Sequence, residues 1–145
     1  MELRKLKREE VTFTLEATED DLPIQGNAQA SGDDADDRRA EAELIIRRAF
    51  GDVWAWASVK VTAEWNGFKG VDYLGACSYK DEAEFRADPY YEMLCENAMS
   101  DLQHSMERIA ETLEPLIQEV TTSSDPDSVS TQALLEELGL GKNHV

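Results

Sequence analysis

The residues best suited to nucleophilic chemistry are two cysteines and two histidines, and their positions do not favour an active site. A cysteine nucleophile needs a base within hydrogen-bonding distance. The available bases are His104, in the middle of an expected helix, and His144, next to the C-terminus. Cys77 falls in an expected strand, where a cysteine usually serves as a small buried residue. Because a phosphate-binding glycine loop and a zinc-ligand motif are also missing from the sequence, we expect a protein that is not an enzyme, with no catalytic residue, no metal and no cofactor.

Four aspartates follow a long polar loop and supply carboxylate oxygens of the kind that calcium and magnesium bind. They are Asp33, Asp34, Asp36 and Asp37, in the segment GDDADDRRAE. Adjacent acids followed directly by Arg38 and Arg39 do not match the alternating ligands of an EF-hand loop. Capping of the next helix explains them better, since carboxylates stabilise the positive end of the helix dipole. Their negative charge also makes them candidates for binding a cationic partner.

A second set of mainly acidic side chains recurs at intervals that return to one side of a helix. The set is Glu92, Glu96, Gln103, Glu107, Glu111 and Glu114. Like charges at this spacing are unfavourable, and Arg108 is the only base between Pro89 and Val120. Two interpretations remain open. The carboxylates take the places of nucleic-acid phosphates on a DNA-binding surface, or they form an ordinary solvated face, as in salt-adapted proteins.

The net charge is the strongest indication of the kind of partner. Basic side chains number 14 and acidic side chains 31, which gives a formal charge of −17, whereas a charge of about 2–8 units keeps a small domain soluble. Such a field repels nucleic acid and anionic membranes, and it attracts cationic surfaces in a salt-dependent way. We therefore expect a cationic protein as partner, with no direct binding of nucleic acid or membrane. The N-terminal segment MELRKLKREE lacks the apolar stretch of a signal peptide, which predicts a cytoplasmic location.

The elements that must position these groups follow from the period of the apolar residues. Alternation predicts strands, and spacings of three and four predict helices. The expected elements are a strand over 11–18, a helix from Asp33 or Asp34 to about Gly51, strands over 53–65 and 71–79, a short helical turn over 80–86 and a long helix over 89–120. Asn66-Gly67 predicts the turn between the second and third strands, with Gly70 available for a longer, bulged connection. Pro115 should kink or split the long helix.

The order strand, helix, strand, strand, helix predicts an α+β fold. We expect a three-stranded antiparallel sheet with helices packed on one face, the last of them the long C-terminal helix. If the first crossover is right-handed, the strand order is 1-3-2. One α+β domain is expected over residues 1–120, followed over 121–145 by a polar linker and a short C-terminal helix or tail.

Two tryptophans at the start of the second strand have two interpretations. Trp54 and Trp56 fall on the side opposite Val59 and Val61. They cover a second small core under the long loop, which is the interpretation we favour, or they form an apolar patch that binds a partner or pairs two protomers in a homodimer.

Two segments, LPIQGNAQASGDDADDRRAE and GDVWAWASVKVTAEWNGFKGVDYLGACSYKDEAEF, resemble a family of small acidic proteins of phages, prophages and other mobile elements. The resemblance covers residues 11–102 and implies no catalytic residue. As a class, such proteins are similar to anti-CRISPR and anti-restriction inhibitors, several of which bind the cationic nucleic-acid channel of their target.

The resemblance and the charge together predict a non-enzymatic inhibitor of a bacterial CRISPR effector that blocks DNA recognition in the bacterial host cell. The side chains expected to bind the effector are Asp33, Asp34, Asp36, Asp37, Glu92, Glu96, Glu107 and Glu111. The alternative is an accessory phage protein that acts as a dimer or binds a host regulator. It would use the face of Trp54 and Trp56 or the C-terminal segment.

Overall fold

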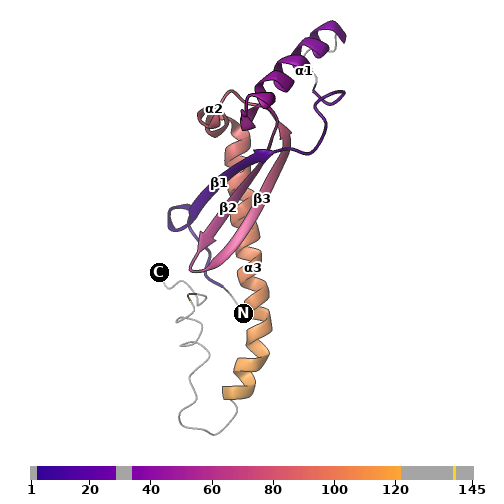
Figure 1. The fold of residues 1–145 in the computed structure, drawn as a ribbon. Helices are drawn as coiled ribbons and strands as arrows, with labels where there is room; N and C mark the ends of the chain where they lie inside the picture. Colours follow the sequence, from indigo (N-terminus) through magenta and orange to yellow (C-terminus); the bar gives the residue numbers. More distant parts are fainter. Residues whose placement is uncertain (1–2, 29–33, 122–138, 140–145) are drawn as a thin grey trace. The chain divides into compact units, whose positions relative to one another are not determined.

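The computed structural model describes residues 3–28, 34–121 and 139 (Figure 1). In these residues the chain forms, in order, the short 3-10 helix η1 (Arg8–Glu10), β1 (Thr12–Glu19), α1 (Asp34–Ala49), the short 3-10 helix η2 (Val53–Ala55), β2 (Ala57–Trp65), β3 (Phe68–Cys77), α2 (Glu82–Ala87) and α3 (Pro89–Thr121). The expected linker and C-terminal helix lie outside the described residues, apart from Thr121 and Gly139. No helix of the described part is both long enough and apolar enough to cross a membrane.

The strands form one antiparallel sheet, which together with the helices confirms the α+β class. The predicted strand order 1-3-2 is wrong, because the order is β1-β2-β3 and β2 lies in the centre. That prediction required α1 to pack across the sheet as a crossover helix, but α1 has no buried residue. The chain instead returns directly beside β1, where the Asp20 N–H donates to the Trp56 carbonyl oxygen with a donor–acceptor distance of 3.0 Å.

The side chains of β2 follow the alternation that the sequence predicts. Ala57, Val59, Val61 and Ala63 have no exposed surface, and the residues between them are only partly covered. Asn66 and Gly67 both have positive φ, 50° and 84°, and form the two-residue turn into β3. Because β3 already begins at Phe68, the longer bulged connection that the sequence suggested at Gly70 does not occur.

Contacts group the chain into two compact units. The first, which we call the hairpin-tip unit, contains the N-terminal segment to Phe13, Thr62–Val71 and the chain from Asn97 onward. The second, the α1 unit, contains Thr14–Val61 and Asp72–Glu96. Each strand and α3 therefore contribute residues to both units.

In the hairpin-tip unit, α3 passes over β3 at Gly70 so closely that no side chain fits between them. A Cβ atom at Gly70 would meet the Ala98 carbonyl oxygen and the Leu102 N, and would lie 2.7 Å from the Leu102 Cα. Next to this contact, the Val71 N–H donates to the Asp101 Oδ2 over 2.9 Å. Leu102, Met106 and Ala110 are buried here. The glycine thus sets how closely the helix packs against the strand.

Helix α3 begins as the sequence predicts, because the Tyr90 N–H donates to the Asp88 Oδ1 over 2.9 Å and Pro89 is the first helical residue. The split expected at Pro115 is wrong, since α3 continues to Thr121, whereas the kink expected as its alternative stays a prediction. Proline removes the N–H that would bond to the Glu111 carbonyl. Glu111 and Pro115 are both exposed, so water can satisfy that carbonyl and the helix need not end.

Replacing Gly70 with alanine should destabilise the protein by about 1–3 kcal/mol, because backbone atoms of α3 must move to admit the Cβ. Urea unfolding followed by circular dichroism measures this effect. Lys69→Ala, an exposed change on the same strand, is the matched control and should change stability by less than about 0.5 kcal/mol. Equal stability of Gly70→Ala and the unmodified protein would contradict the close packing.

Candidate functional site

The aspartates at the start of α1 are placed largely as expected. Asp34 and Asp36 are exposed and Asp37 is half-buried, all in the first turn of the helix. Asp33 lies outside the described residues. Carboxylates in a first turn stabilise the helix through its dipole, so a local structural role already explains this group. Among the described residues no cluster of histidine, cysteine or acidic side chains could hold a metal ion.

The glutamates of α3 form two pairs. Glu92 and Glu96 are exposed and belong to the α1 unit, whereas Glu107, half-buried, and Glu111, exposed, belong to the hairpin-tip unit. Within each pair the spacing is four residues, which corresponds to about 6 Å along a helix. The structure therefore supports two separate pairs of carboxylates directed at solvent.

The opposite side of α3 explains why these carboxylates face outward. Leu94, Cys95, Ala98, Leu102 and Met106 have no exposed surface, and burial of this stripe fixes the rotation of the helix about its axis. The sequence placed Gln103 on the outer face with the glutamates. It instead binds the N-terminal segment, accepting from the Leu6 N–H over 3.4 Å and donating to the Arg4 carbonyl over 3.0 Å.

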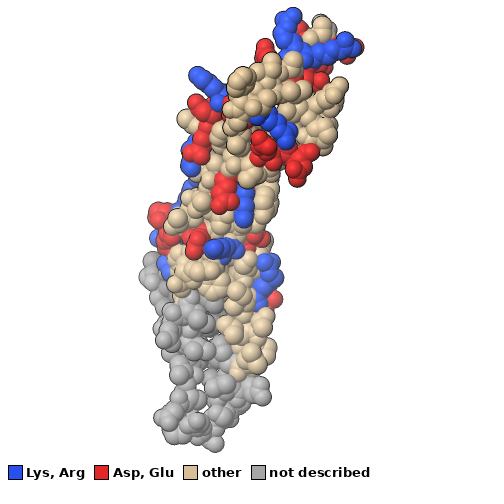
Figure 2. Space-filling model, in the orientation of Figure 1, with Lys and Arg blue, Asp and Glu red and all other residues tan. Residues whose placement is uncertain are grey.

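Basic side chains are interspersed with acidic ones over part of the surface. Figure 2 shows red and blue groups alternating on the face in view, with no single continuous acidic area. Along α3 the one arginine, Arg108, donates to the Ser105 Oγ over 3.0 Å. Helix α3 carries seven acidic residues and one arginine, a net charge of −6, so −11 of the total charge of −17 lies on other segments of the chain.

The tryptophans occupy two different apolar clusters in the α1 unit. Trp56 is only 5% exposed, packs with Ile24 and Ala28, and donates from its Nε1 to the Leu22 carbonyl over 2.8 Å. This confirms the favoured interpretation for Trp56, a small second core under the long loop. Trp54 is half-buried, with its ring centroid 5.4 Å from that of Phe85. Trp56 therefore offers almost no surface to a partner.

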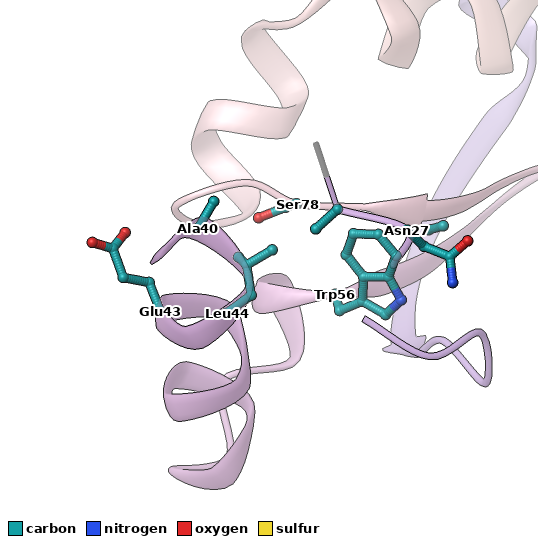
Figure 3. A pocket seen from close by; sticks show the side chains of 8 residues that line it. Asn27, Ala40, Glu43, Leu44, Trp56 and Ser78 are labelled. Atoms are coloured by element: carbon teal, nitrogen blue, oxygen red, sulfur yellow. The ribbon is translucent and has the colours of Figure 1, made fainter. Parts of the chain in front are cut away.

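A pocket of about 470 Å³ opens beside Trp56 (Figure 3). It is lined by Asn27, Ala28, Ala40, Glu43, Leu44, Trp56, Ala76 and Ser78. Leu44 points toward the indole ring, whereas the Glu43 carboxylate points away from it. The lining combines the indole ring and alkyl side chains with the polar side chains of Asn27, Glu43 and Ser78, so it favours neither an apolar nor a charged ligand.

Asp20 organises the end of the sheet in the α1 unit, and the sequence analysis did not identify this role. Its Oδ1 accepts from the Leu22 N–H over 2.7 Å and its Oδ2 from the Ala76 N–H over 2.8 Å. Ala76 has a positive φ of 51°, a conformation that costs energy in a residue with a Cβ atom. An aspartate that accepts a hydrogen bond from the N–H two residues later is a recognisable turn signal in a sequence. The bond from Ala76 to Asp20 is not recognisable in this way, because the two residues are far apart in the chain.

Cys77 is held as a thiol. Its Sγ donates to the Ala57 carbonyl over 3.3 Å. Burial raises the pKa of Cys77 to about 11, and the charge of Asp20 adds to this rise, although a backbone hydrogen bond partly opposes it. A nucleophilic cysteine needs a lowered pKa, so this environment suits a structural residue. His104, the expected base, is exposed on α3.

No protein-family model matches this chain, and neither a curated protein nor a solved structure shows significant similarity to it. These comparisons therefore assign neither a family nor a function to the chain.

The raised pKa of Cys77 predicts slow alkylation by iodoacetamide at pH 8, on the order of 100-fold slower than that of an ordinary thiol, because so little thiolate is present. The rate should rise with pH to a midpoint near 11. Peptide mapping by mass spectrometry separates Cys77 from Cys95, and Cys77→Ser identifies the modified peptide. A midpoint near 9 in protein that circular dichroism shows to be folded would contradict this assignment.

Proposed function

We propose that the protein is a non-enzymatic inhibitor that binds the cationic nucleic-acid-binding surface of a bacterial defence complex, a CRISPR effector in the first place. The observation that carries the proposal is the pair of exposed or partly exposed glutamates in each half of α3, opposite the buried stripe. Carboxylates about 6 Å apart along a helix axis can meet arginine and lysine side chains that otherwise bind phosphates.

The net charge of −17 supports the same proposal. A strongly acidic protein is drawn toward a cationic channel over several ångströms, which raises the rate of encounter. Binding also displaces the anions and the ordered water on that channel. The attraction weakens as salt screens the charges, because the Debye length falls to about 8 Å at physiological ionic strength.

The resemblance to acidic proteins of mobile elements supports the choice of a CRISPR effector over other cationic proteins. It is an analogy of class. The α1 aspartates Asp34, Asp36 and Asp37 are a secondary part of the proposed surface, since their place in the first turn already has a structural explanation. Glu96, Glu107 and Glu111 have no such local role, because carboxylates away from the ends of a helix gain nothing from its dipole. Glu92, in contrast, lies in the first turn of α3 and has the same structural explanation as the α1 aspartates.

The alternative, an accessory protein that binds through the tryptophan face, has less support because Trp56 is only 5% exposed. The version that uses the C-terminal segment concerns residues outside the described part. Both versions stay as outcomes of the experiment below.

The test replaces Glu92, Glu96, Glu107 and Glu111 with glutamine, which removes the charges and keeps the side-chain shape. Purified CRISPR effectors and restriction enzymes are each incubated with the protein before labelled DNA is added, at low and high salt, and DNA binding is followed by mobility shift. The unmodified protein should abolish the shifted band of its target, less so at high salt. The variant with all four substitutions should be needed at a concentration at least about ten times higher to abolish the shifted band to the same extent.

The matched control neutralises four exposed acids elsewhere, Glu9, Glu16, Asp21 and Glu64, and so changes the net charge by the same amount. It should inhibit nearly as well as the unmodified protein. Equal loss in both variants would mean that only the total charge matters. Full inhibition by the α3 variant would refute the role of these glutamates, and inhibition of no member of the panel would favour the accessory protein.

A further inference from the structure

We propose that the outward face of α1 is a self-association surface, on which a second copy of the chain docks its own α1 in antiparallel orientation. This face, the α1 outer face, consists of Ala42, Ile45, Ile46, Ala49 and Phe50, all of them exposed. Ile45 is 48% exposed, Ile46 56% and Phe50 89%. Three large apolar side chains on two turns make a contiguous apolar patch, of the kind that marks an interaction site.

The other side of α1 is already engaged within the α1 unit, so the direction of the outer face is fixed. Leu44 packs against the cluster around Trp56. Arg47 forms an ion pair with Asp52 at 2.8 Å and donates to the Tyr79 carbonyl. Within the described part of the chain, these contacts leave the opposite side of α1 uncovered.

The helix also lacks the burial that a helix of its length needs. Isolated helices shorter than about 12–15 residues are marginal in water even when rich in alanine, and most helices in proteins gain their stability from packing an apolar face. Helix α1 has 16 residues, and none of them is buried. Docking of a second copy on the outer face would supply the missing burial.

The net charge of α1 indicates which molecule binds the outer face. It favours a second copy of the chain over the cationic partner of the proposed function. Helix α1 carries four of the 14 bases of the chain and five of its 31 acids, which gives a net charge of −1. The α1 helices of two molecules therefore repel each other only weakly, although each molecule carries a charge of −17. Exposed Arg38 and Arg39 lie between the aspartates of the first turn and the apolar patch. They would repel a cationic surface at the patch, although the first turn itself is acidic.

An antiparallel arrangement brings opposite charges together. It places the acidic first turn of one helix, with Asp34, Asp36 and Asp37, beside the basic last turn of the other, with Arg47 and Arg48. Arg38, Ala42, Ile45 and Ala49 follow at intervals of four, three and four residues, the spacing of a helix pair in contact. The alanines let the two backbones approach closely. Because a single helix about 24 Å long buries less than a standard interface, we expect a dimer with a dissociation constant in the range of about 10–100 μM.

Sedimentation velocity of the protein alone, from about 5 to about 200 μM, tests the proposal. A monomer should predominate at the low end and a dimer at the high end. Added salt should strengthen the dimer, because it screens the repulsion between acidic molecules and leaves apolar contacts intact. Hydrogen exchange of the α1 amides should slow as the dimer forms. A monomer at every concentration and salt would overturn the proposal.

A matched pair of variants locates the interface. Ile45→Ser, Ile46→Ser and Phe50→Ser together should weaken self-association at least tenfold. The control replaces three other exposed apolar residues, Tyr90, Ile109 and Leu116, which are 49%, 39% and 55% exposed, and it should dimerise like the unmodified protein. An interface on α1 would be contradicted if only the control variant lost the dimer. It would also be contradicted if both variants still formed the dimer. Since no effector is present, the result does not depend on the proposed function.

Discussion

The contact between α3 and β3 at Gly70 is the constraint on which the rest of the hairpin-tip unit depends. Because the strand has no side chain at this point, the backbone at Ala98 and Leu102 comes directly against it. That approach buries Leu102, Met106 and Ala110 and thereby turns the glutamates of the same helix toward solvent. The apolar stripe and the acidic face are two consequences of one packing contact.

The charged groups are distributed differently on two helices, for which we propose two different partners. The described part of α3 beyond its first residues combines several carboxylates with a single arginine, whereas α1 nearly balances its charges and exposes isoleucine and phenylalanine. An acidic face and a neutral apolar face respond to salt in opposite directions. The proposed inhibition should therefore weaken with salt, while the proposed self-association should strengthen.

Local patterns in the sequence were sufficient to predict most of the elements. The alternation from Ala57 to Ala63, the Asn66-Gly67 turn and the Asp88-Pro89 helix start each depend on neighbouring residues, and each appears as predicted. The strand order could not be predicted in this way. It depends on whether α1 packs on the sheet, and the apolar residues of α1 suggested a buried face that the structure does not have.

The candidate site shows the same division between local and long-range information. Periodicity predicted which side of α3 is apolar, and so which glutamates face solvent. It could not predict that Gln103 binds the N-terminal segment or that Asp20 bonds to Ala76, because both contacts join distant parts of the chain. Gly70 was similarly interpreted from its neighbours as a turn residue, although its function is to admit a helix.

The central claim is that this protein competes with DNA for the DNA-binding surface of a defence complex. The most direct test measures how the affinity of that complex for DNA changes with the concentration of this protein. If the acidic face of α3 occupies the DNA-binding surface, the apparent dissociation constant for DNA should rise in proportion to protein concentration, with no plateau, because the two ligands exclude each other. A plateau would mean that DNA and the protein bind together at separate sites. An unchanged dissociation constant in the presence of bound protein would contradict the account.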